Sequence, residues 1–78
     1  MAKYLSDETR IYMIMQRKLL GMTQNDLAEL FNVTRTSIVS FENGYNERVD
    51  IFFKYVYNVI PSNEREKIIS EYVGNTLK

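Results

Sequence analysis

The spacing of apolar residues is the feature that most constrains this fold, because they recur every third or fourth position through most of the chain. Five residues interrupt this spacing: Gly21, Asn32, Gly44, Pro61 and Gly74. The sequence has no clean run of two-residue alternation bounded by hairpin turns, as strands would require. The pattern therefore predicts an all-α fold in which short breaks separate the helices.

Five helices are predicted between these breaks, and most have suitable end residues. The expected ranges are 7–20, 24–31, 35–43, 48–59 and 63–74. Hydroxyl side chains stand at the expected N-caps of the first three: Ser6, Thr23 and Thr34. Asn63 and Glu66 have capping-box spacing, and Gly74 is expected to end the last helix. Residues 51–57 also have strand-like propensity, but we predict a helix there.

The length and composition exclude several functional classes. A chain of 78 residues is expected to form a single domain, residues 1–78, around one apolar core. The sequence contains no cysteine and no histidine, which excludes disulfides, thiol nucleophiles, imidazole bases and Cys/His zinc sites. It also shows no glycine-rich phosphate loop and no paired catalytic carboxylates. We therefore expect no enzymatic activity, no cofactor and no metal.

The sequence also carries no sign of a membrane protein. No stretch approaches the roughly 18 apolar residues that a membrane span needs. The first eight residues, MAKYLSDE, lack the apolar run of a signal peptide. No convergent set of polar groups suggests a small-molecule ligand. We expect a cytoplasmic protein with no membrane partner.

The charge balance, taken alone, counts against nucleic acid as a partner. Lys plus Arg and Asp plus Glu both total 10, so the formal net charge is zero. Proteins that bind nucleic acid usually have a basic excess, because neutralising phosphates supplies much of their affinity. A DNA-binding function would have to come from a specific arrangement of side chains.

Residues 23–44, TQNDLAELFNVTRTSIVSFENG, have the pattern of two short helices joined at a sharp angle. The break at residues 32–34 separates helices of about two turns each. Ala28 is small enough to let the two helices approach each other. Apolar residues at helical spacing predict a shared core: Leu27, Phe31, Val33, Ile38 and Phe41.

If Ile38 and Phe41 point inward, the opposite face of the second of these helices forms a short polar stripe. Its members are Arg35, Thr36, Val39, Ser40 and Asn43. Arg can bind guanine through two hydrogen bonds, Thr and Ser can bind several base edges, and Val can contact a thymine methyl group. The stripe is a plausible base-reading surface. The alternative is a solvated helix face, which the composition of the stripe alone favours.

The same segment resembles the helix-turn-helix of the phage-repressor, or Xre/Cro-like, family, which includes the lambda repressor. The pattern is Thr-Gln-x-x-Leu-Ala-x-x-Phe-x-Val-Thr-Arg-x-x-Ile-x-x-Phe-Glu-x-Gly, at residues 23–44. The resemblance is close over residues 21–44 and looser over residues 9–61. It implies a five-helix bundle that binds double-stranded DNA by placing helix 35–43 in the major groove. The expected function is a transcription regulator, a repressor that acts as a homodimer on a palindromic operator.

The resemblance also implies roles for individual residues. It implies base contacts from Arg35, Thr36, Val39 and Ser40, and DNA-backbone contacts from Gln24, Ser37 and Asn43. Tyr45 and Arg48, in the loop that follows, are further candidates for backbone contacts. Arg17 and Glu42 match positions that form a structural ion pair in the family.

We expect a homodimer because the DNA-binding segment is weakly charged. Residues 23–44 contain one positive side chain, Arg35, and three negative ones, which predicts modest affinity for each monomer. The last helix has more apolar residues than one small core can cover. They form the predicted dimer interface: Ile68, Ile69, Tyr72, Val73 and Leu77.

An alternative function is a protein-interaction module of the same fold, such as an antirepressor or antitoxin, that binds another protein and not DNA. The neutral charge and the acidic helix-turn-helix segment support this alternative. Leu30 supports it too, because it stands at a position that is polar in the family.

Overall fold

The helical spacing of the sequence produces five helices in the computed structural model, which describes residues 3–78. They are α1 (Asp7–Leu19), α2 (Gln24–Phe31), α3 (Arg35–Glu42), α4 (Val49–Val59) and α5 (Ser62–Thr76). No strand occurs within residues 3–78, and residues 51–57 are helical despite their strand-like propensity. The all-α prediction is confirmed. Residues 1 and 2 of the predicted domain lie outside the described range.

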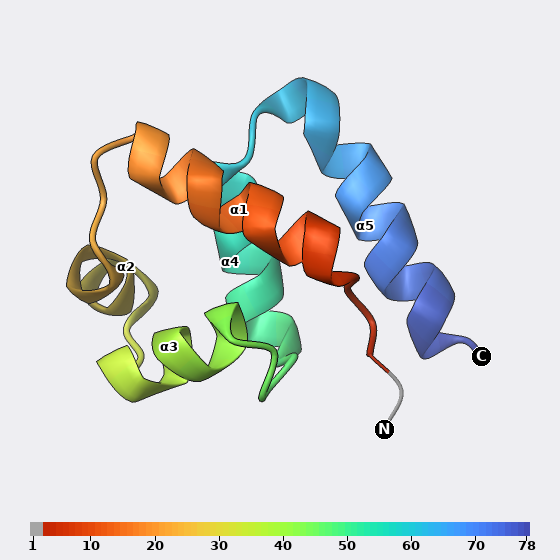
Figure 1. Cartoon of the computed structure of the whole chain (residues 1–78), viewed down its shortest axis with the longest axis horizontal. Helices are drawn as coiled ribbons and strands as arrows, with labels where there is room; N and C mark the ends of the chain where they lie inside the picture. The colour runs from red at the N-terminus through yellow and green to blue at the C-terminus, as the bar shows by residue number, and fades with distance from the viewer. Residues whose placement is uncertain (1–2) are drawn as a thin grey trace.

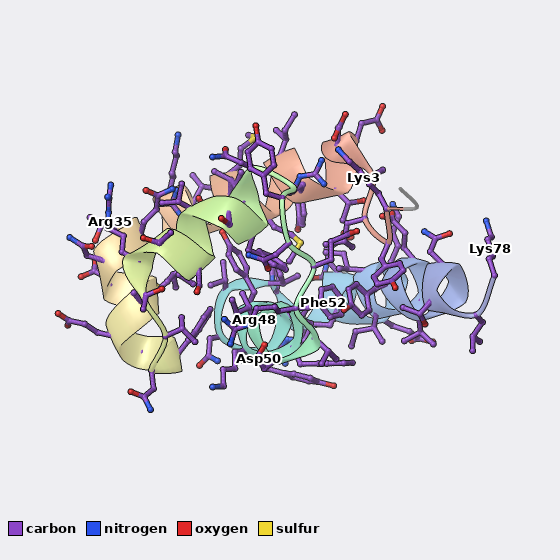
Figure 2. The ribbon with its side chains drawn as sticks, turned by 90° about the horizontal axis from the view of Figure 1, so that it is seen from below. Lys3, Arg35, Arg48, Asp50, Phe52 and Lys78 are labelled. Atoms are coloured by element: carbon purple, nitrogen blue, oxygen red, sulfur yellow. The ribbon has the colours of Figure 1, made fainter. Side chains whose placement is uncertain are left out.

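The arrangement of the helices separates the two ends of the molecule. Figure 1 shows α1 crossing α4, with α2 and α3 on one side of this pair and α5 on the other. In Figure 2, Arg35 of α3 and Lys78 after α5 lie at opposite ends of the molecule. The candidate DNA-binding helix and the C-terminal helix therefore have separate surfaces.

Local interactions set the ends of the first three helices. The predicted N-caps all accept a hydrogen bond from a backbone N–H three residues later: Ser6, Thr23 and Thr34. The Asp26 carboxylate also accepts from the Thr23 N–H at 2.8 Å, which completes a capping box at α2. These bonds lower the pKa of Asp26. Asn32 ends α2 in the left-handed conformation, with a φ of 57°, which asparagine tolerates better than most residues.

The last helix is longer than predicted, at both ends. It begins one residue earlier, directly after Pro61, so Asn63 lies inside the first turn and forms no capping box. Gly74 does not end the helix and lies within it. The Asn75 side-chain amide donates to the Tyr4 carbonyl at 2.8 Å, so the last turn is anchored to the N-terminal segment. This contact between distant parts of the chain could not be seen in the local pattern.

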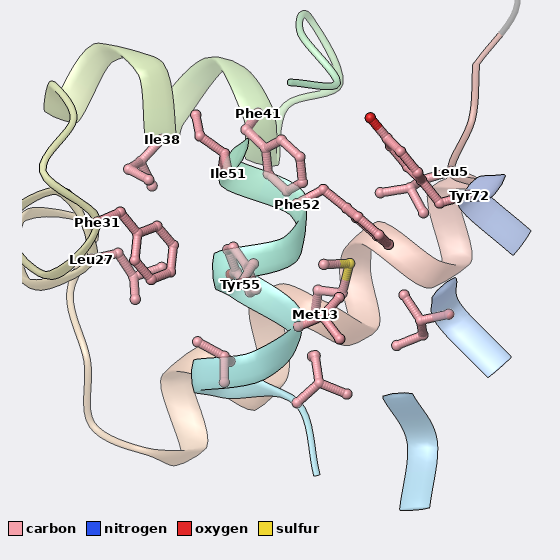
Figure 3. Packing of buried hydrophobic residues seen from close by; sticks show 14 of the residues in the cluster. Leu5, Met13, Leu27, Phe31, Ile38, Phe41, Ile51, Phe52, Tyr55 and Tyr72 are labelled. Carbon is pink, nitrogen blue, oxygen red and sulfur yellow. The ribbon is translucent and has the colours of Figure 1, made fainter. Parts of the chain in front are cut away.

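All five helices contribute to one apolar core, with α4 at its centre (Figure 3). The Tyr55 ring of α4 lies 6.2 Å from the Phe31 ring and 5.8 Å from the Phe41 ring. Toward α5, the Phe52 ring stacks on Tyr72 with their centroids 3.9 Å apart. Because α4 contacts aromatic rings from both sides, it connects the α2–α3 pair to α5.

The apolar face predicted on the last helix is divided between the core and the surface. Ile68 and Tyr72 are only 4% exposed each, and the Tyr72 hydroxyl donates to the backbone carbonyl of residue 47 at 2.6 Å. Their assignment to the dimer interface is therefore corrected, because they pack within the monomer. Ile69, Val73 and Leu77 are partly or fully exposed. We call these three residues the α5 ridge.

A second exposed apolar surface lies on α1. Ile11, Met15 and Leu19 follow one another at intervals of four residues, so they share one face of the helix. Their exposed fractions are 58%, 55% and 76%. The buried Met13 lies on the other side of the helix, toward the core. We call Ile11, Met15 and Leu19 the α1 ridge.

The buried carboxylate of Glu42 connects four helices. Arg17 of α1 donates to it through Nε at 2.7 Å and Nη2 at 3.0 Å, which is the ion pair that the family resemblance implied. Gln24 Nε2 of α2 donates at 3.0 Å, and the Tyr55 hydroxyl of α4 donates at 2.7 Å. The remaining guanidinium nitrogen of Arg17 donates to the Met22 carbonyl at 2.8 Å. We call Glu42, Arg17, Gln24 and Tyr55 the Glu42 cluster.

Burial and charge act together in this cluster. Burial disfavours the charged form of Arg17, but the hydrogen bond and the negative charge of Glu42 outweigh this and raise the pKa of Arg17. Burial and, secondly, the charge of Glu42 raise the pKa of Tyr55 far above its usual 10.0. Within residues 3–78, no buried side-chain nitrogen or oxygen lacks a hydrogen-bond partner. Each side chain of the cluster therefore has a hydrogen-bond partner.

Glu42→Ala is expected to lower the free energy of unfolding by about 3 kcal/mol, because it leaves Arg17 buried without a counter-charge. Urea denaturation followed by circular dichroism measures this change. The exposed Glu66 of α5 provides the control, since Glu66→Ala should change stability by less than about 0.5 kcal/mol. The double variant Arg17→Met/Glu42→Leu should be more stable than Glu42→Ala, because it buries no charge. A double variant no more stable than Glu42→Ala would contradict this account.

Stability should fall at alkaline pH because of Tyr55. Its folded-state pKa lies above the unfolded value of 10.0, so above that pH the unfolded chain loses a proton that the native protein keeps. The stabilisation is complete below the unfolded pKa and is lost as the pH rises beyond it. We expect the free energy of unfolding to decrease between about pH 9 and about pH 11, and less steeply in Tyr55→Phe. Equal slopes in urea titrations of the two proteins would refute the role of Tyr55.

Candidate nucleic-acid interface

The turn between α2 and α3 fixes which face of α3 reaches the surface. The left-handed Asn32 reverses the chain, and the Val33 N–H donates to the Ala28 carbonyl at 3.0 Å. Leu27 and Ile38 are completely buried where the two helices meet. Because one face of α3 is buried against α2 and α4, its opposite face is turned outward.

The stripe predicted for base reading lies on this outward face. Arg35 and Thr36 are exposed in the first turn of α3, and Val39 and Ser40 are partly exposed one turn later. Asn43 follows as the exposed C-cap. The stripe therefore presents a guanidinium, two hydroxyls and an apolar side chain along one helix. These groups are suited to base edges in a major groove.

Gln24 links this surface to the Glu42 cluster. Its side-chain nitrogen donates to Glu42, while its side-chain oxygen accepts from Arg35 Nη2 at 3.5 Å. The long second contact holds Arg35 only weakly. Arg35 is therefore oriented toward the start of α2 and is still free to turn toward a ligand.

The loop after α3 folds back along that helix. Gly44 adopts a φ of 81°, and a Cβ there would lie 2.9 Å from Arg10 Cζ, so both backbone conformation and space favour glycine. Asn46 Nδ2 donates to the Ser37 carbonyl at 3.2 Å. Tyr45 is 81% exposed. The Tyr45 N–H donates to the Ser40 carbonyl at 2.8 Å, so the loop holds an exposed aromatic residue at the end of α3.

Arg48, at the end of this loop, is paired with an acid. Its Nε and Nη2 donate to the two carboxylate oxygens of Asp50 at 3.2 and 2.8 Å, and Figure 2 shows the two residues side by side. Its Nη1 donates to Ser37 Oγ at 3.2 Å. The hydrogen bond from Arg48 lowers the pKa of Asp50. Ser37 and Arg48, both predicted to contact the DNA backbone, are thus brought together.

A hollow at the start of α2 contains two residues that the sequence analysis did not select, Lys18 and Asn25. It has a volume of about 430 Å³ and is lined by Arg17, Lys18, Met22, Thr23, Gln24, Asn25 and Arg35. A helix N-terminus carries partial positive charge and free N–H groups, which favour anions. Lys18 lies in the last turn of α1, and only the tertiary fold brings it to the start of α2.

Two other kinds of site are absent from the described part of the chain. No helix within residues 3–78 combines the length and apolar character needed to cross a membrane. Over the same range, no group of three or more His, Cys, Asp or Glu side chains is arranged to hold a metal ion.

Comparison with known proteins identifies the same region. A scan against protein-family models matches residues 13–48 to HTH_3, described as helix-turn-helix. The matched range begins within α1, contains α2 and α3, and ends at the N-cap of α4. Searches of the curated proteins and of the solved structures found no match. The family prediction is confirmed: residues 13–48 are a helix-turn-helix domain of the HTH_3, or Xre/Cro, type.

Proposed function

We propose that this protein is a sequence-specific transcription regulator that reads operator DNA with α3 in the major groove. An HTH_3 domain itself implies DNA binding and transcription regulation. The observation that carries the finer proposal is the outward polar stripe of α3, which stands opposite the fully buried Ile38.

The residues of the stripe have separate roles in this proposal. Arg35 binds a guanine through two hydrogen bonds, and Thr36 and Ser40 bind neighbouring base edges. Val39 lies between them and contacts a thymine methyl group. Because Arg35 is held only by one long hydrogen bond to Gln24, it can extend to a base at little cost.

Residues around the stripe position the helix by contacting the DNA backbone. Ser37, Asn43, Tyr45 and Arg48 lie on α3 or in the loop that follows it. At the start of α2, Gln24 and Lys18 border the hollow that would take a phosphate against the helix N-terminus. These contacts supply affinity that the neutral net charge does not.

We further propose a homodimer that pairs through the α5 ridge and acts as a repressor. A palindromic operator requires this two-fold pairing to hold two copies of α3 about one turn of DNA apart. Repression follows from occlusion, because bound protein prevents other proteins from using the same DNA. The function that we propose includes no enzymatic activity, in keeping with the typical members of this family. We propose that it acts in the cytoplasm, where it would reach the DNA.

A second candidate function is the protein-interaction module. The α1 ridge and Leu30, which is 54% exposed, favour it, because exposed apolar surface outside the DNA-binding face is suited to a protein partner. In this case α3 would not contact DNA.

Arg35→Ala should weaken binding to a preferred duplex by about 1–3 kcal/mol and relax the preference at one base pair, because the guanine contact is lost. Fluorescence anisotropy with a preferred duplex and with single-base variants measures both effects. The control is Lys67→Ala, an exposed residue of α5 far from α3, which should leave binding unchanged. If the wild-type protein binds no duplex at low salt, the protein-interaction function is favoured instead.

Leu77→Glu should convert the dimer to a monomer, because it places a charge within the apolar contact that the α5 ridge would form. Sedimentation equilibrium at tens of micromolar measures the molecular mass. Met15→Glu, in the α1 ridge, is the matched control and should leave the dimer intact. A monomeric wild-type protein would refute the dimer, and a dimer disrupted by Met15→Glu alone would place the interface on α1.

A further inference from the structure

Arg48 already binds an anionic group of the same chain, the carboxylate of Asp50. Asp50 accepts two hydrogen bonds from its guanidinium, in the same forked geometry that arginine uses with phosphate oxygens. Ser37 accepts a third, so each outer nitrogen and Nε of Arg48 has an intramolecular partner. The side chains of Arg48 and Asp50 are 46% and 44% exposed, so the pair is accessible to a ligand.

The position of Asp50 favours its charged form independently of Arg48. It lies in the first turn of α4, where the positive end of the helix favours a carboxylate. The hydrogen bond from Arg48 lowers the pKa of Asp50 most, and the nearby backbone N–H groups of Ile51 and Asp50 lower it further. Asp50 therefore stays ionised at neutral pH even when Arg48 turns away.

A DNA phosphate that binds Arg48 must therefore displace the Asp50 carboxylate and then lie close to its negative charge. On operator DNA, the base contacts of α3 compensate for this cost. On other DNA no base contacts form, and the cost reduces binding directly.

We propose that Asp50 is a specificity-determining residue, which restrains Arg48 and thereby suppresses binding to non-operator DNA. This proposal rests on the DNA-binding function proposed above.

Asp50→Asn is expected to increase affinity for a random-sequence duplex about five-fold, which is the range of an exposed ion pair. The slope of log affinity against log salt concentration should also become steeper, by the amount that about one phosphate contact contributes. Fluorescence anisotropy at several salt concentrations measures both quantities. Glu66→Gln removes the same charge from the exposed face of α5 and should change neither.

Simple repulsion between Asp50 and DNA would also weaken binding, so the experiment needs Arg48→Gln and the double variant Arg48→Gln/Asp50→Asn. If Asp50 acts by restraining Arg48, most of the gain from Asp50→Asn disappears in the Arg48→Gln background. An equal gain in both backgrounds would overturn the proposal. An Asp50→Asn variant that binds the random-sequence duplex no more tightly than the wild-type protein would overturn it too. If none of the proteins binds the duplex at low salt, the proposed DNA-binding function fails as well.

Discussion

The buried carboxylate of Glu42 is the interaction on which the helix-turn-helix geometry depends. A buried, unpaired carboxylate is costly, so α3 can occupy its position only when the donors from α1, α2 and α4 surround Glu42. Since Glu42 is the last residue of α3, these bonds fix the end of the helix opposite Arg35. Together with the buried Ile38, they determine which face of α3 is left for DNA.

Several positive side chains of this neutral chain are engaged within the fold and not free for phosphates. Several of the positive side chains serve the fold: Arg10 binds Asp7, Arg17 binds Glu42, Lys54 donates to the Phe31 carbonyl and Arg65 donates to the Ile60 carbonyl. The basic residues left near the candidate interface include Lys18, Arg35 and Arg48, and Asp50 pairs with the last of these. In the proposed function, sequence-dependent contacts from α3 must then contribute more of the binding energy than general attraction to phosphates.

The sequence predicts the α2–turn–α3 unit well because its determinants are local. The Thr23 and Thr34 caps and the left-handed Asn32 act within a few residues, so α2 and the turn occur at the predicted positions. Apart from the Arg17–Glu42 ion pair, which the family resemblance implied, features that depend on distant contacts were not predicted. The burial of Tyr72 depends on Phe52. Lys18 reaches the start of α2 only through the fold. Local spacing cannot specify which of two apolar faces a neighbouring helix will cover.

The central claim is that the outward stripe of α3 reads DNA sequence, and selection of bound sequences from a pool of random duplexes tests it most directly. The account predicts enrichment of one sequence arranged as two inverted half-sites, with centres about 10 base pairs apart. The same selection with the Arg35→Ala variant should lose the preference at one position in each half-site. Recovery of no enriched sequence by the wild-type protein, or of the same sequence by both proteins, would contradict the claim.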